Sequence, residues 1–158
     1  MAIPVLPRDF FQFGYVIRDL DGAMRTMRDK FGVTKWKVSQ LPETAPGRTL
    51  AFAYVDGAMI ELVDLRPGQD TIYHAWIPES NEGLRLHHLG YMIDEEADWN
   101  ARIAQFEGAG FAPALVGGIP GRMQWYYSDT VATLGHYTEL IRFTSEAGKA
   151  YWADVPYN

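Results

Sequence analysis

Four polar residues that could share chemistry stand at matching places in the two halves of this 158-residue chain. Gln12 opens the run Gln-Phe-Gly-Tyr-Val-Ile, and His88 opens the similar run His-Leu-Gly-Tyr-Met-Ile 76 residues later. Glu61 and Glu139 each lie in a short apolar run near the end of one half, 78 residues apart. One imidazole, two carboxylates and one amide oxygen form a mixed nitrogen and oxygen set, which suits zinc, nickel, cobalt, iron or manganese. The four residues are therefore candidate ligands of one divalent metal ion.

A metal would also compensate negative charge, because burying two carboxylates beside a histidine costs several kcal/mol of free energy unless their charge is balanced. Four protein ligands would leave one or two coordination positions open for water or for substrate oxygens. A metal in such a site can polarise a carbonyl group and stabilise an enolate. A carboxylate beside it can move the proton, which makes Glu139 and Glu61 the candidate catalytic bases.

Strands must position these residues. Residues 10–17 and 84–93 are apolar and favourable for β-structure, and side chains alternate along a strand. If Gln12 and His88 point to the inner face of their strands, so do Gly14 and Gly90, while the intervening residues lie under a helix. The same alternation places Met59 beside Glu61 and places two further residues beside Glu139, namely Tyr137 and Ile141.

The remaining pattern predicts that each half reads β-α-β-β-β. In the first half, a helix begins near Asp19 or Asp21 and ends at Gly32, and the pair Asp56-Gly57 predicts a hairpin. A second helix is predicted over 95–107 and stops at Gly108. The other predicted strands are 34–40, 49–55 and 59–65 in the first half and 112–116, 122–128 and 136–143 in the second. Eight strands with two main helices predict an α+β fold in which two curved sheets face a cavity.

We predict one domain over residues 1–158, with a first module at 9–66, a second at 84–144 and a tail at 145–158. The tail should hold a short helix. Residues 117–121 are rich in glycine and predict a loop, but they do not lead from a strand into a helix and so do not form a phosphate loop.

Composition excludes several classes of function. A net charge of −6 argues against a nucleic-acid or polybasic membrane surface, and the absence of cysteine excludes disulfides and thiolate chemistry. No apolar run approaches the roughly 20 residues that span a bilayer. The first residues lack the charged and apolar regions of a signal peptide, so the expected location is the cytoplasm.

The repeat and the four polar positions resemble the vicinal oxygen chelate superfamily, which includes glyoxalases, methylmalonyl-CoA epimerase, extradiol dioxygenases and bleomycin-resistance proteins. The resemblance covers residues 8–144. His88-Leu89-Gly90 looks like the family's ligand motif in the first strand of a module, and the runs around Glu61 and Glu139 look like its motifs in the last strand. Gln12 stands where most members have histidine, a departure known in some glyoxalases. The chain lacks the Asp-Pro-Asp-Gly turn of glyoxalase I, which favours the epimerase-like branch.

The resemblance implies a metal-dependent isomerase, epimerase or lyase that acts through an enolate-type intermediate on a bulky, apolar, carbonyl-containing small molecule. It also implies a homodimer. One alternative is an extradiol-type dioxygenase, for which one histidine is missing at Gln12. Another is a metal-free protein that binds a small molecule without chemistry. The sequence leaves open the substrate, the metal, the choice of base, and whether the ligands come from one chain or from two.

Each site residue also has a purely structural interpretation. The glutamates could be solvent-facing residues on edge strands, and Gln12 could be a hydrogen-bonded core amide. We interpret His87 as a core histidine bonded to a backbone carbonyl, and His74 and His136 as surface or rim residues. The aromatic side chains of the predicted strands are more often core residues than substrate contacts. They are Phe52, Tyr54, Trp125, Tyr126 and Tyr127.

Overall fold

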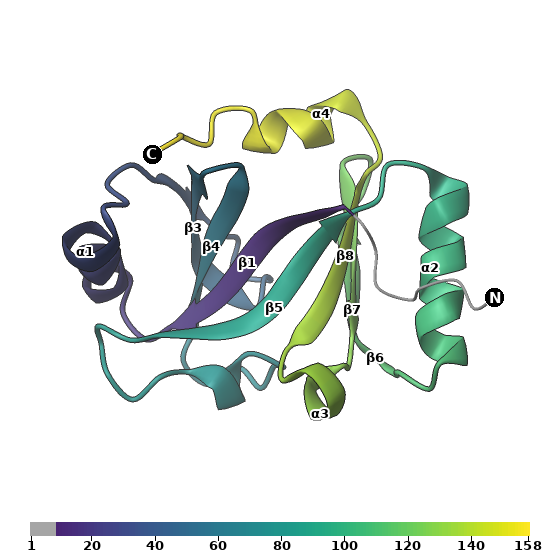
Figure 1. The fold of residues 1–158 in the computed structure, drawn as a ribbon, viewed down its shortest axis with the longest axis horizontal. Coiled ribbons are helices and arrows are strands. Elements are labelled where there is room, and N and C mark those ends of the chain that lie inside the picture. The colour runs from purple at the N-terminus through teal and green to yellow at the C-terminus, as the bar shows by residue number, and fades with distance from the viewer. Residues whose placement is uncertain (1–8) are drawn as a thin grey trace. The chain divides into compact units, whose positions relative to one another are not determined.

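The computed structural model describes residues 9–158 (Figure 1). Its main strands and helices follow one another in the predicted order. The first half holds β1 (Phe10–Ile17), α1 (Leu20–Phe31), β2 (Lys37–Gln40), β3 (Gly47–Val55), β4 (Ala58–Leu65) and a 3-10 turn η1 (His74–Trp76). The second half holds β5 (Leu84–Met92), α2 (Glu96–Gly108), β6 (Pro113–Ile119), β7 (Met123–Ser128), α3 (Val131–Leu134) and β8 (Tyr137–Phe143). The chain continues through α4 (Glu146–Lys149) and η2 (Ala150–Trp152). The predicted α+β class with two β-α-β-β-β modules is confirmed.

The chain divides into two compact units. The first unit comprises residues 12–87 and 154–158, and the described part of the second comprises residues 9–11 and 88–153. The first unit carries the strand order β2-β3-β4-β1 and the second carries β5-β8-β7-β6. In each unit the first strand of the module runs parallel to the last, and the other neighbours are antiparallel.

One helix covers one face of each sheet. In the first unit, Leu20 and Met24 of α1 pack on Ile17 and Leu62. In the second unit, Trp99 and Phe106 of α2 belong to a core cluster with three sheet residues, namely Tyr91, Tyr126 and Leu140. Because side chains alternate, the opposite face of each sheet carries Gln12 or His88, as predicted.

Local signals in the sequence account for several boundaries. Asp19 caps α1 by accepting a hydrogen bond from the Gly22 amide at 2.7 Å, and Gly32 ends the helix with a φ of 73°. Asp56 and Gly57 take φ values of 46° and 83°, as a tight hairpin between β3 and β4 requires. The short helix predicted in the tail is α4.

The structure corrects other boundaries. Strand β2 begins at Lys37 rather than at residue 34, because the amides of Thr34 and Lys35 donate to Asn158 Oδ1 at 2.9 and 2.8 Å instead of to a strand. Helix α2 includes Gly108, and the glycine with positive φ after it is Gly110. The helix α3 was not predicted.

Strand β6 is longer than predicted and runs into the glycine-rich segment expected to be a loop. Gly117 pairs with Trp125 of β7, and a Cβ at Gly117 would lie 2.6 Å from the indole Nε1. The glycine therefore lets a large ring lie over the strand without breaking the pairing. None of the helices within residues 9–158 has the length and apolar character needed to cross a membrane.

Candidate functional site

The two units present their polar residues at the same strand register. In the first unit, Gln12 is the register partner of Met59, and Gly14 is the register partner of Glu61. In the second unit, His88 is opposite Tyr137, and Gly90 is opposite Glu139. The predicted repeat is thus a repeat of strand pairing, and each glutamate faces a neighbour that has no side chain.

All four side chains are buried. Gln12 and His88 are 0% exposed, Glu61 is 9% exposed and Glu139 is 4% exposed. The alternative that the glutamates are solvent-facing residues is therefore wrong. An aromatic residue stands on the other side of each glutamate, Phe52 of β3 beside Glu61 and Tyr127 of β7 beside Glu139.

In the second unit, His88 and Glu139 are in direct contact. The His88 Nε2 and Glu139 Oε2 atoms lie 3.2 Å apart. Two donors bound to one metal at about 2.1 Å lie about 3.0 Å apart in an octahedron and about 3.4 Å apart in a tetrahedron. The 3.2 Å separation of this pair lies between these two values.

The Glu139 Oε2 atom is buried, and although His88 Nε2 lies within ion-pair distance, the oxygen accepts no hydrogen bond from any residue within 9–158. Leaving a buried acceptor unsatisfied costs about 1–3 kcal/mol, and more when the group is charged. A divalent cation would compensate the charge of this oxygen, and the neighbouring imidazole could serve as a second donor to it. The pair therefore fits a metal site in its donor types, spacing and burial.

In the first unit, the Gln12 amide contacts the side chain of Met59. Gln12 Nε2 donates to Met59 Sδ at 3.3 Å, while Gln12 Oε1 is buried with no hydrogen-bond partner in the described part of the chain. Glu61 lies on the same face, two positions farther along β4. This unit thus offers an amide oxygen and a carboxylate, both of which suit hard or borderline cations.

The structure brings His88 and Glu139 together, and it places Gln12 and Glu61 on one sheet face of the other unit. Among residues 9–158, no group of three or more His, Asp or Glu side chains is clustered closely enough to hold a metal ion. Convergence of all four residues on one ion stays a prediction.

The sequence also identifies the family. Residues 11–128 match the family described as the Glyoxalase/Bleomycin resistance protein/Dioxygenase superfamily. The chain belongs to this superfamily. It is the vicinal oxygen chelate superfamily that the repeat resembles, and the match ends before β8, which carries Glu139. No curated protein sequence matches the chain.

Several solved structures share the fold of this chain. Methylmalonyl-CoA epimerase from Mycobacterium tuberculosis is 16% identical, with a TM-score of 0.64 over 90% of this chain and 92% of that one. A variant of the Streptomyces coelicolor epimerase in complex with 2-nitronate-propionyl-CoA is 17% identical, with a TM-score of 0.59 over 87% and 98% of the two chains. A hypothetical protein from Bacillus halodurans is 14% identical, with a TM-score of 0.61 over 88% and 96%.

His87 has the structural role expected of it. It is 0% exposed, its Nε2 lies 3.2 Å from the Ile72 carbonyl oxygen, and its ring stacks on Tyr73 at 4.5 Å. Trp76 of η1 meets the same ring edge-on. The two adjacent histidines of β5 therefore have different roles. His87 packs against the segment before the strand, and His88 faces Glu139.

Tyr127 was not among the predicted site residues. Its ring meets the His88 ring edge-on at 5.1 Å, and its register partner is Glu139. The next residue back, Tyr126, points under α2, where burial and then the charge and hydrogen bond of Glu107 raise its pKa to about 12. Alternation in the sequence separates the two tyrosines, but only the pairing of β7 with β8 shows which one faces Glu139.

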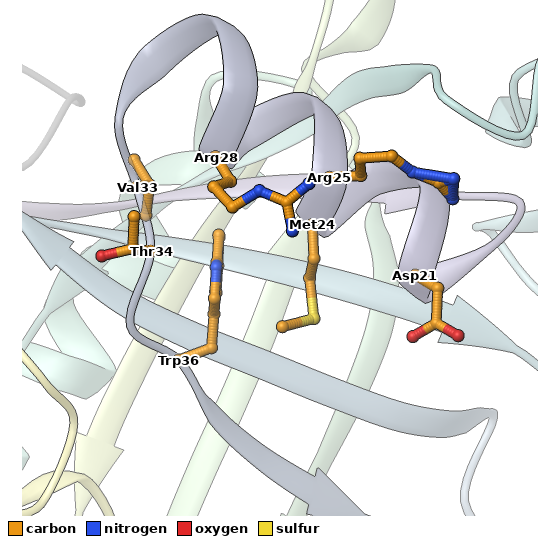
Figure 2. Close-up of a pocket in the computed structure, with 7 residues that line it drawn as sticks. All are labelled: Asp21, Met24, Arg25, Arg28, Val33, Thr34 and Trp36. Atoms are coloured by element: carbon orange, nitrogen blue, oxygen red, sulfur yellow. The ribbon is translucent and has the colours of Figure 1, made fainter.

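A separate pocket of about 340 Å³ lies in the first unit. Figure 2 shows that its lining residues come from α1 and from the segment leading to β2, and that they include Arg25, Arg28 and Trp36. Met24 and Trp36 also pack in the core beneath α1, so this pocket is on the helix-covered face of the sheet. Gln12 and Glu61 are on the opposite face, and none of the four predicted ligands lines the pocket.

Proposed function

We propose that this member of the superfamily is a metal-dependent isomerase, epimerase or lyase that moves a proton next to a carbonyl group. The observation that carries the proposal is the buried contact between His88 Nε2 and Glu139 Oε2, on the strand pair that repeats the register of Gln12 and Glu61. We further propose that Gln12 and Glu61 complete the ligand set, in the same chain or in a second copy.

Different residues of the chain have different roles in the proposed reaction. When bound, a divalent metal would polarise the substrate carbonyl and make the adjacent C–H more acidic. His88 holds its Nε2 toward Glu139 Oε2, and the second carboxylate oxygen, Oε1, is free in this proposal to accept the proton. Gly90 leaves space on one side of Glu139, Tyr127 is its register partner on the other side, and the carboxylate is only 4% exposed, which limits its contact with water. Glu61, between Gly14 and Phe52, is the candidate for returning a proton.

Acyl thioesters are the first substrates to screen. The epimerases that share this fold act on methylmalonyl-CoA by their names, and an acyl thioester carries an acidic C–H beside a carbonyl. Hemithioacetals of 2-oxoaldehydes and hydroxyketones also carry a C–H beside a carbonyl and complete the set. The substrate, the homodimer and the cytoplasmic location stay predictions.

Metal analysis of protein purified without a histidine tag tests the proposal. We expect about one equivalent of a divalent metal per chain, which chelators remove and zinc, nickel, cobalt, iron or manganese restores. A protein that binds none of these ions but binds small molecules would instead be a resistance-type binder. Uptake of oxygen by an iron-loaded protein would indicate the dioxygenase alternative.

Metal should also stabilise the fold. A ligand that binds only the native state adds about 2.7 kcal/mol to the free energy of unfolding at a free concentration of about 100 times its Kd. For a chain of this size, this corresponds to a rise in Tm of about 5–10 °C. Thermal unfolding with and without a chelator measures the effect. Identical melting curves with chelator and with each metal would contradict a native metal site.

A further inference from the structure

The Gln12 amide can adopt two orientations that exchange its oxygen and its NH₂ group, and the orientation decides whether the side chain can bind a cation. A glutamine side chain ends in one acceptor oxygen and one donor NH₂ group, and only the oxygen can bind a metal. Gln12 is fully buried, so its amide is held by the protein alone. Whatever contacts the NH₂ group therefore decides whether the oxygen is available.

Met59 is the residue that contacts the NH₂ group of Gln12. It is the register partner of Gln12, it is 0% exposed, and its sulfur accepts the hydrogen bond from Gln12 Nε2 at 3.3 Å. A thioether sulfur has no hydrogen to donate and is a weak acceptor, so it favours the NH₂ group over the oxygen. With Nε2 turned to the sulfur, Oε1 points away and accepts no hydrogen bond from residues 9–158.

We infer that Met59 is a positioning residue, whose sulfur fixes the Gln12 amide so that Oε1 is presented to a metal ion. The metal part of this inference rests on the proposed function. The second unit needs no sulfur to orient an amide, because the residue matching Gln12 is His88, which already contacts Glu139. The sulfur is thus specific to the half of the chain that uses an amide.

Replacing Met59 by leucine removes the acceptor and keeps most of the volume and shape. The matched control is Met27→Leu, since Met27 is a buried methionine of the same unit in the cluster under α1. We expect Met59→Leu to weaken metal binding by about tenfold or more, the usual effect of losing a residue that orients a ligand. Met27→Leu should leave the affinity within about twofold.

A double-mutant cycle separates orientation from packing. In a Gln12→Glu background both terminal atoms are oxygens, so no orientation has to be chosen. Adding Met59→Leu to that background should leave the metal affinity unchanged or raise it, because the sulfur no longer has an NH₂ group to hold. An equal loss of affinity in both backgrounds would show that Met59 only packs, and would overturn the inference.

A measurement without metal keeps this test independent of the proposed function. In ¹⁵N-labelled, metal-free protein, the side-chain NH₂ signals that disappear in Gln12→Glu belong to Gln12. They should show a nuclear Overhauser effect to the Met59 methyl group, and they should shift in Met59→Leu but not in Met27→Leu. Absence of both effects overturns the inference, whereas a protein that shows both and binds no metal overturns only the proposed function.

Discussion

Replacing His88 by alanine is expected to abolish metal binding and with it the activity. His88 supplies the only imidazole among the four proposed ligands, and its Nε2 contacts the carboxylate that we propose as both ligand and base. Since the loss of an outer-shell partner alone costs about 10–100-fold in metal affinity, loss of the ligand should cost more than about 100-fold. Equilibrium dialysis against zinc or cobalt measures the affinity. The spectrum of a cobalt-loaded protein reports directly on whether nitrogen is still bound.

The adjacent histidine provides a matched control. His87→Ala should bind metal with an affinity close to that of the unchanged protein, because His87 faces Tyr73 and the Ile72 carbonyl rather than Glu139. It should instead lose about 2–4 kcal/mol in the free energy of unfolding, from the cavity and the unpaired carbonyl. Equal metal loss in the two variants would contradict the site, and full metal retention in His88→Ala would remove His88 from it.

Replacing Glu139 by glutamine should slow the chemical step by a factor of about 10²–10⁴ while the protein still binds some metal. The amide oxygen can still coordinate, but an amide cannot take up a proton as a carboxylate does. General-base catalysis typically contributes a factor of this size. The measurement is exchange of the substrate α-hydrogen with deuterated water, with metal-loaded protein and a substrate found by the thioester, hemithioacetal and hydroxyketone screen.

The matched control is Glu61→Gln, which replaces the corresponding residue of the first unit. If Glu139 is the base, exchange should be slowed far more in Glu139→Gln than in Glu61→Gln. The reverse order would assign the base to Glu61. Turnover of a substrate by the unchanged protein without any α-hydrogen exchange would contradict the proton-transfer mechanism and favour the dioxygenase alternative.

Elements with strong local signals were predicted close to their observed positions. The cap at Asp19, the turn at Asp56 and Gly57 and the stop at Gly32 depend on residues within a few positions, so they can be recognised without the rest of the fold. The start of β2 was wrong because its neighbours bond Asn158, more than 120 positions away in the chain. The end of β6 was wrong because residues 117–119 pair with β7, where Gly117 leaves room for the Trp125 indole, so the glycine-rich segment extends the strand instead of ending it.

The sequence by itself determined that Gln12 corresponds to His88 and Glu61 to Glu139, because a repeat and a side-chain period of two are both properties of the chain read locally. The tertiary structure decided what each of these residues touches. The pairing of β7 with β8 sets Tyr127 beside Glu139, and the pairing of β4 with β1 sets the Met59 sulfur against the Gln12 amide. Register between strands depends on packing over the whole sheet, and a shift of one residue would turn each side chain to the other face.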